Sequence, residues 1–255
     1  MDLTDTHCHL QFDKLSADLD GMLERAQKTG VNRLICVGTS LKDSLRAAEI
    51  ARQYKSVWAS AGVHPHEASK FQADFAKKEF ASLLSQPKVV AAGEIGLDFY
   101  KDYAPRLDQE KALRAQIEAA LPSGLPFIFH VRDAWFDFWR IFDEYDSLGG
   151  VVHSFSSGIK QLNAALERGL YIGLNGIMTF TKDAAQLEAA KQVPLDRLLL
   201  ETDAPFLTPE PHRGQICEPK HVAATAEFLA GLRGESTGEL SKATTDNAVR
   251  LFSLE

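Results

Sequence analysis

Histidines and carboxylates recur in this chain at the ends of short apolar segments. The first case is Leu3-Thr4-Asp5-Thr6-His7-Cys8-His9-Leu10. Side chains two apart in a β-strand share a face, so His7 and His9 point the same way and can hold one metal ion from one side. A bare pair of this kind is weak support by itself, because isolated motif matches often fail. The metal hypothesis therefore depends on what the other apolar segments supply.

Five later apolar segments carry the same kinds of residue, mostly at their C-terminal ends. These residues are His64, Glu94, His130, His153, Glu201 and Asp203. Chance would scatter histidines and carboxylates over helices and loops as well. The pattern therefore indicates one shared site that several segments build together.

Short apolar runs alternate with amphipathic runs along the whole chain, which predicts alternating strands and helices. We expect strands at 3–10, 33–38, 57–64, 89–98, 126–132, 149–155, 171–176 and 198–205. We expect helices at 18–29, 75–85, 106–120, 160–168, 183–192, 219–232 and 237–252. A further helix, capped by Ser40, should run to Tyr54, and another after the fifth strand should run to about Tyr145. Eight buried parallel strands are the number that closes a (β/α)8 TIM barrel, whose active site lies at the C-terminal ends of the strands. No linker or repeat divides the chain, so a single hydrolase domain over 1–255 is expected.

The candidate ligands are too many for one catalytic zinc ion, which needs three protein ligands and a water. Two divalent metal ions that share a carboxylate fit the set better, and Glu94 is the candidate bridge. Two ions about 3.5–4 Å apart clamp both oxygens of an in-line displacement, and their charge attracts an anionic substrate such as a phosphodiester. The expected ligands are His7, His9, Glu94 and Asp203 for one ion, and Glu94, His130 and His153 for the other.

Composition narrows the class of protein. The net charge of −7 over 255 residues argues against a basic surface built for duplex DNA. The three cysteines lack zinc-finger spacing and are expected to be reduced thiols. The N-terminus shows no signal-peptide pattern, and no stretch has the length of a membrane span. We therefore expect a cytoplasmic protein without a membrane partner.

Six motifs, in this order along the chain, resemble those of the TatD-type DNase family. They are His7-Cys8-His9, Gly62-Val-His-Pro65, Gly93-Glu-Ile-Gly-Leu-Asp98, His130-Val-Arg132, His153-Ser-Phe155 and Glu201-Thr-Asp-Ala-Pro205. The resemblance implies a metal-bearing (β/α)8 barrel of the amidohydrolase-like superfamily. It also implies a divalent-metal-dependent deoxyribonuclease that acts in the 3′–5′ direction on DNA, single-stranded or at 3′ ends, with the same six ligands.

One departure from the family pattern concerns the loop Arg213-Gly-Gln-Ile-Cys-Glu-Pro219, where Cys217 stands at a position that usually carries Asn. It leaves the ligands untouched but puts substrate contacts of that loop in doubt. Many amidase-type relatives bridge their metals with a modified Lys on the fourth strand. Residues 89–98 contain no Lys, and Glu94 takes that place, which favours the nuclease branch.

Individual roles follow from position. Asp203 is the candidate general base, with Glu94 as the second catalytic residue. His64, Arg132 and Arg213 are the candidate substrate-binding residues. His64 can equally hydrogen-bond to a metal ligand and orient it. The roles of Glu201 and Cys217 stay open.

Two alternatives remain at this point. The same metal site would serve to hydrolyse a carboxylic ester or amide, as in aminoacyl-tRNA deacylation. Imidazole ligands suit Zn, Mn, Ni, Co or Fe, whereas the family is linked with Mg.

The aromatic residues after the fifth strand follow helical spacing and are expected to pack on the barrel. Only Trp135 or Phe136 is placed to stack on a nucleic-acid base.

Overall fold

The computed structural model describes residues 1–71, 73–101, 103–146 and 148–254. The last residue of the predicted domain, Glu255, lies outside these residues. The strands are β1 (Leu3–Cys8), β2 (Val31–Val37), β3 (Val57–Ala61), β4 (Val89–Asp98), β5 (Phe127–Arg132), β6 (Gly150–Val152), β7 (Tyr171–Leu174) and β8 (Leu198–Leu200). The helices are α1 (Asp13–Ser16), α2 (Leu19–Lys28), α3 (Leu41–Gln53), α4 (Ala73–Leu84), α5 (Arg106–Ala120), α6 (Trp135–Phe142), α7 (Ile159–Glu167), α8 (Ile177–Phe180), α9 (Ala184–Gln192), α10 (Val222–Arg233) and α11 (Thr237–Phe252).

The eight strands follow one another in a single sheet in chain order, from β1 to β8. A parallel bridge between Cys8 and Ala204 joins β1 to the segment after β8. This order, with a helix after nearly every strand, is that of a (β/α)8 barrel and confirms the predicted fold class. None of the helices in the described part of the chain combines the length and apolar character that a membrane crossing requires.

The chain divides into two compact units, and each carries some of the candidate site residues. The first unit comprises Met1–Cys36 and Ser154–Glu255, and the second comprises Val37–His153. The predicted single domain over 1–255 stays a prediction.

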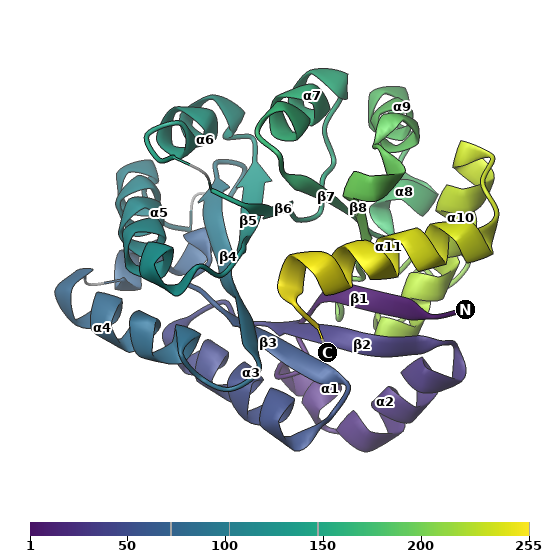
Figure 1. Cartoon of the computed structure of the whole chain (residues 1–255), viewed down its shortest axis with the longest axis horizontal. Coiled ribbons are helices and arrows are strands. Elements are labelled where there is room, and N and C mark those ends of the chain that lie inside the picture. The colour runs from purple at the N-terminus through teal and green to yellow at the C-terminus, as the bar shows by residue number, and fades with distance from the viewer. Residues whose placement is uncertain (72, 102, 147, 255) are drawn as a thin grey trace. The chain divides into compact units, whose positions relative to one another are not determined.

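In the first unit, β1 pairs in parallel with β2 and β7 with β8. Helix α11 lies along β1, the yellow helix beside the purple strand in Figure 1. The helix starts at a capping box in which Ser236 accepts the N–H of Glu239 and the Glu239 carboxylate accepts the N–H of Ser236. Buried apolar side chains from this helix, such as Leu240 and Phe252, complete the core of the unit.

In the second unit, β4 pairs in parallel with both β3 and β5, and β5 pairs with β6. Helices α3 and α5 cover β3 and β4 (Figure 1). Two buried glutamines of α5 hold the strand ends. Gln116 accepts the N–H of Val63 at 2.7 Å and donates to its carbonyl, and Gln109 does the same for Asp98 at 2.8 Å. The backbone next to His64 and at Asp98 is therefore fixed by side chains of one helix.

Strands β1, β2, β3, β6, β7 and β8 end before their predicted last residues, and in three of them the ladder ends just ahead of the predicted site residues. β3 ends at Ala61, β6 at Val152 and β8 at Leu200, so the polar residues that follow lie on loops just past the strands. Two of these loop residues, Ser154 and Asp203, have φ near +49° and +61°. Left-handed backbone of this kind breaks the alternation of faces that a regular strand imposes.

Candidate metal and active site

The carboxylate of Glu94 faces three imidazoles in the second unit, and we call these four residues the Glu94 group. Its Oε1 lies 2.7 Å from Nδ1 of His130, 3.5 Å from Nε2 of His64 and 3.6 Å from Nε2 of His153. The Glu94 side chain is only 4% exposed. A buried carboxylate is costly unless positive or donating groups surround it, and here imidazoles from three other segments do so.

The backbone around Glu94 is irregular, and this brings the strands close together. The pairing of β4 with β5 shifts register between Gly93 and Ile95, a bulge that re-aims the Glu94 side chain. Gly96 has φ +152°, and a Cβ there would lie 1.9 Å from the carbonyl oxygen of His130. Only glycine allows this close approach, so Gly96 lets His130 lie beside Glu94.

Asp98 holds the other side of His130. Its Oδ2 lies 3.1 Å from Nε2 of His130 and 2.9 Å from Nε2 of His66. Burial disfavours a charged His130, but its hydrogen bonds with Asp98 and Glu94 outweigh burial and raise its pKa. Burial likewise opposes charge on Asp98, yet the bond with His130 lowers the pKa of this carboxyl well below its usual value. The pair of carboxylates makes the position of His130 favourable for a cation.

His64 is largely enclosed, with 12% of its side chain exposed, and neutral. Burial lowers the pKa of His64 to about 3, although the nearby Glu94 charge opposes the shift. Its Nδ1 accepts the backbone N–H of His66 at 3.1 Å. A neutral imidazole carries one proton, so the nitrogen that faces Glu94 is an N–H donor. His64 is therefore close enough to join the ligands, but its tautomer suits hydrogen-bond donation.

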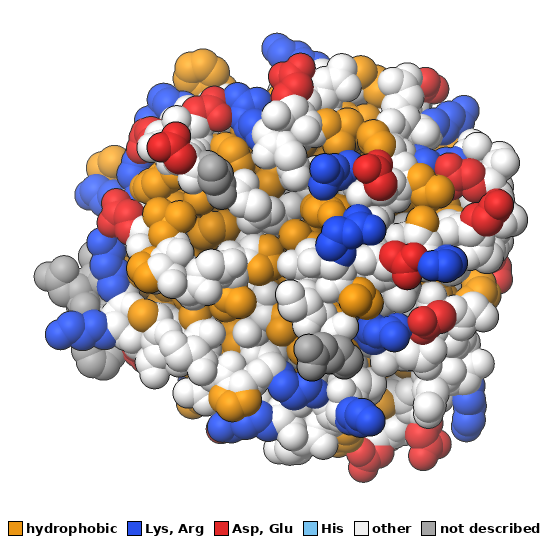
Figure 2. All heavy atoms as spheres, viewed as in Figure 1, with side chains coloured by type: hydrophobic (Ala, Val, Ile, Leu, Met, Phe, Trp, Pro, Cys, Tyr) orange, Lys and Arg blue, Asp and Glu red, His pale blue; other side chains and the backbone are white. Residues whose placement is uncertain are grey.

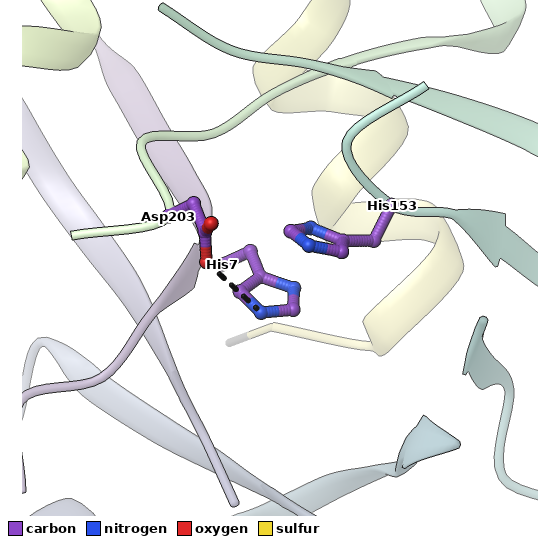
Figure 3. A group of neighbouring side chains, drawn as sticks. All are labelled: His7, His153 and Asp203. Atoms are coloured by element: carbon purple, nitrogen blue, oxygen red, sulfur yellow. Dashed lines mark ion pairs between the residues drawn. The ribbon is translucent and has the colours of Figure 1, made fainter. Parts of the chain in front are cut away.

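The first unit contributes a second cluster, the Asp203 group, which consists of His7, His9 and Asp203. Oδ1 of Asp203 lies 3.8 Å from Nε2 of His7 and 3.3 Å from Nε2 of His9, and Figure 3 shows the carboxylate directed at the His7 ring. The imidazoles of His7 at the end of β1 and of His9 just past it thus approach the same oxygen, as their spacing predicts. The ring of His9 also stacks on Phe12, with centroids 4.7 Å apart.

Asp5 ties β1 to the segment that carries Asp203. Its carboxylate accepts the backbone N–H of His7 at 3.2 Å, the backbone N–H of Thr202 at 2.9 Å and the Thr202 hydroxyl at 2.6 Å. Complete burial is the larger effect and raises the pKa of Asp5 to about 7, although these hydrogen bonds by themselves lower it. Asp5 therefore makes its hydrogen bonds inside the core of the unit.

Glu201 takes a supporting position. One of its oxygens accepts the backbone N–H of Ser154 at 2.6 Å, next in the chain to His153. Asn175 donates to the Ser154 hydroxyl at 2.8 Å and also approaches Glu201. The carboxylate therefore fixes the left-handed turn at Ser154.

The predicted arginines make contacts of their own. The guanidinium of Arg132 lies 3.9 Å from the centroid of the Tyr100 ring and is exposed. Arg213 lies 3.9 Å from the Phe180 ring and donates to the carbonyl of Thr208 at 2.7 Å. Cys8 is fully buried with its thiol donating to the carbonyl of Ile35, and burial raises its pKa and that of Cys217. Neither thiol is prepared to act as a nucleophile.

The donor atoms present suit a divalent metal ion. Ligand atoms of His64, Glu94 and His130 lie within 4.8 Å of one another. In the Asp203 group two imidazole nitrogens approach one carboxylate oxygen. Imidazole with carboxylate is a ligand set that transition-metal ions accept, so each group fits the predicted role.

Sequence reasoning missed His66 and the contact of Asp98 with His130. Asp98 stands four residues after Glu94 in the same strand, where alternation of faces could have linked the two. Gln109 and Gln116 of α5 belong to no motif, and the local sequence does not indicate that they bind the backbone of the strand ends.

The chain is similar to known proteins over nearly its whole length. A family model described as TatD related DNase matches residues 4–253. The chain is 37% identical to "Uncharacterized metal-dependent hydrolase YabD" of Bacillus subtilis over 98% of both chains, and 36% identical to "3'-5' ssDNA/RNA exonuclease TatD" of Shigella flexneri over 98% of both. The crystal structure of YJJV, a TatD homolog from Escherichia coli K12, superposes with a TM-score of 0.93 at 32% identity, covering 99% of this chain and 98% of that one. The predicted family and enzyme class are confirmed: the chain belongs to the TatD-related DNase family of metal-dependent hydrolases.

Proposed function

We propose that this protein hydrolyses phosphodiester bonds of nucleic acid and removes nucleotides from the 3′ ends of single strands, with two divalent metal ions per chain. The observation that carries the proposal is the buried Glu94 carboxylate with three imidazoles around its Oε1. A relative that is 36% identical over nearly its whole length bears the name of a 3′–5′ ssDNA/RNA exonuclease, which supports the same substrate class.

The proposed ligands are those expected from the sequence: His7, His9, Glu94, His130, His153 and Asp203. Bound divalent ions supply Lewis-acid polarisation of the phosphoryl oxygens and an activated water. Glu94 neutralises part of the metal charge from a buried position, and Asp98 orients the His130 ring through its other nitrogen.

Asp203 is the proposed general base. Its side chain is 17% exposed and lies on the loop after β8, so its carboxylate can both take a proton from the attacking water and return it to solvent. His64 is the proposed contact for a phosphate oxygen, through the same Nε2–H that faces Glu94 in this structure. Arg132 and Arg213 are exposed cations for more distant phosphates.

The test combines metal content with a substrate panel. Protein stripped with a chelator and reloaded separately with Mg²⁺, Mn²⁺ and Zn²⁺ should bind about two ions per chain, as a two-metal site requires. It should then shorten single-stranded DNA stepwise from the 3′ end and duplex DNA far more slowly. A single strand protected by 3′ phosphorothioate linkages is the matched control. Turnover of aminoacyl-tRNA or a simple carboxylic ester without any shortening of DNA or RNA would contradict the proposal.

A further inference from the structure

Two large aromatic side chains stand in solvent just after β4. Tyr100 is 56% exposed and Tyr103 is 67% exposed. The loop that carries them is held by Asp98, whose Oδ1 accepts the backbone N–H groups of Tyr100 and Lys101 at 3.0 Å each. The ring of Tyr100 is therefore exposed on a backbone that Asp98 holds in place.

The same carboxylate connects this loop to the Glu94 group. Oδ2 of Asp98 contacts both His66 and His130. The ring of Tyr103 meets the ring of His66 edge to face, with centroids 4.8 Å apart. One imidazole thus separates Tyr103 from the carboxylate that orients a proposed ligand.

A cation lies against the first of these rings. Asp98 and Arg132 are register partners in the pairing of β4 with β5, and the N–H of Phe99 donates to the carbonyl of Arg132 at 2.9 Å. This pairing places the guanidinium over the Tyr100 ring at 3.9 Å. Lys101 lies 5.3 Å from the same ring. Positive charge and π faces are therefore interleaved at this strand edge.

Helix α6 adds a third ring. Phe136 is 80% exposed, whereas Phe138 and Phe142 of the same helix pack against Phe129 in the core. Phe136 follows Arg132 by four residues, which limits the separation of their Cα atoms to about 14 Å. Trp135, the other ring considered from the sequence, instead stacks on Trp139 at 5.5 Å.

We propose that Tyr100, Tyr103, Phe136 and Arg132, here called the ring platform, bind the unpaired bases of a single-stranded nucleic acid next to the bond that is cut. The inference rests on the proposed nuclease function. Every base offers a π face to an aromatic ring, and the arginine adds a cation for the neighbouring phosphate. Bases inside a duplex already stack on each other, so the ring platform selects single strands.

The charge of the whole chain favours binding by short-range stacking over long-range attraction. The net charge is −7, and Figure 2 shows Lys and Arg side chains interspersed with Asp and Glu side chains on the face in view. A chain with this charge balance gains little from long-range attraction to nucleic acid. Stacking next to the site would supply affinity that a basic surface supplies in other nucleases.

The experiment compares two oligonucleotides of equal length, one with bases and one built of stable abasic units at its 3′ end. Tyr103→Ala with Phe136→Ala should raise KM for the normal oligonucleotide about tenfold or more, because stacking on each ring contributes to binding. Its kcat should stay within about twofold, and the abasic oligonucleotide should show the same KM with both proteins. Leu107→Ala, which removes an equally exposed apolar side chain from α5, is the matched control. Tyr103→Phe alone keeps the ring and should keep the KM of the wild-type protein.

Unchanged KM on the normal oligonucleotide would overturn the ring platform while leaving the nuclease function intact. Equal losses on both oligonucleotides would also overturn it, because they would indicate a structural role for the rings. If the wild-type protein cuts neither oligonucleotide, the proposed function itself fails.

Discussion

The Glu94 group and the Asp203 group use the same side-chain types in different surroundings. In the Glu94 group the carboxylate is 4% exposed and its nearest imidazole nitrogen lies at 2.7 Å. In the Asp203 group the carboxylate is 17% exposed and its imidazole contacts measure 3.3 and 3.8 Å. Glu94 lies within a strand, whereas Asp203 lies on a loop with left-handed backbone.

This difference suits the two carboxylates to different roles. An enclosed carboxylate among imidazoles is held in position by its contacts, which suits the binding of metal ions. A partly exposed carboxylate can exchange protons with water, which suits a general base. We therefore expect Glu94 to matter for metal content and Asp203 mainly for the rate of the chemical step.

Glu94→Gln tests the first half of this comparison and should have the largest effect. The amide keeps the shape of the side chain but removes the negative charge that the imidazoles and metal ions share. Activity on single-stranded DNA should fall about 10³-fold, equivalent to several kcal/mol of lost metal assistance. Elemental analysis should show the loss of metal from the same protein.

The matched control is Glu118→Gln, an exposed carboxylate that pairs with Lys77 in the same unit. This variant should keep its activity and metal content. Full metal loading with unchanged activity in Glu94→Gln would break the comparison at its strongest point.

Asp203→Asn tests the second half and should have a smaller effect on metal. The amide oxygen still offers a ligand beside His7 and His9, but it cannot take a proton. The kcat should fall about 10²-fold, as for loss of a general base, with KM little changed. Loss of metal as complete as in Glu94→Gln would show that the two carboxylates do the same work.

The smallest effect expected concerns the stability of the metal-free protein. Asp5 and His64 should make its free energy of unfolding depend on pH in opposite directions. Asp5 has a pKa near 7 when folded and 3.8 as its ordinary value, so its stabilising contribution is complete below 3.8 and is lost as pH rises through 7. His64 has a pKa near 3 when folded and 6.5 as its ordinary value, so its contribution is complete above 6.5 and is lost as pH falls through 3.

Denaturant unfolding from pH 4 to 7 measures both contributions. Relative to the wild-type protein, the free energy of unfolding of Asp5→Asn should increase as pH rises. That of His64→Gln should increase as pH falls. Each change should amount to about 2–4 kcal/mol over the full range. If the free energies of unfolding of the two variants, relative to the wild-type protein, changed with pH in the same direction, the two pKa shifts would be refuted.

The sequence by itself determined the fold class and the candidate ligands. Apolar segments such as 33–38 and 126–132 have the length of buried strands, and helical periods separate them. Parallel strands bring their carboxyl ends to one edge, so His7, His130 and Asp203 could be assigned to a common edge from their order alone. The motifs around them led to the right family.

Only the tertiary structure decided how each side chain is used. The bulge at Glu94, the bond of Asp98 to His130 and the N–H of His66 on His64 depend on register and on loops past the strand ends. The glutamines of α5 reach Val63 and Asp98 from a helix whose local pattern shows only amphipathic spacing. Periodicity specifies which face a residue occupies, but the partner on that face comes from a distant part of the chain. The close approach of two backbones, as at Gly96, then selects that partner.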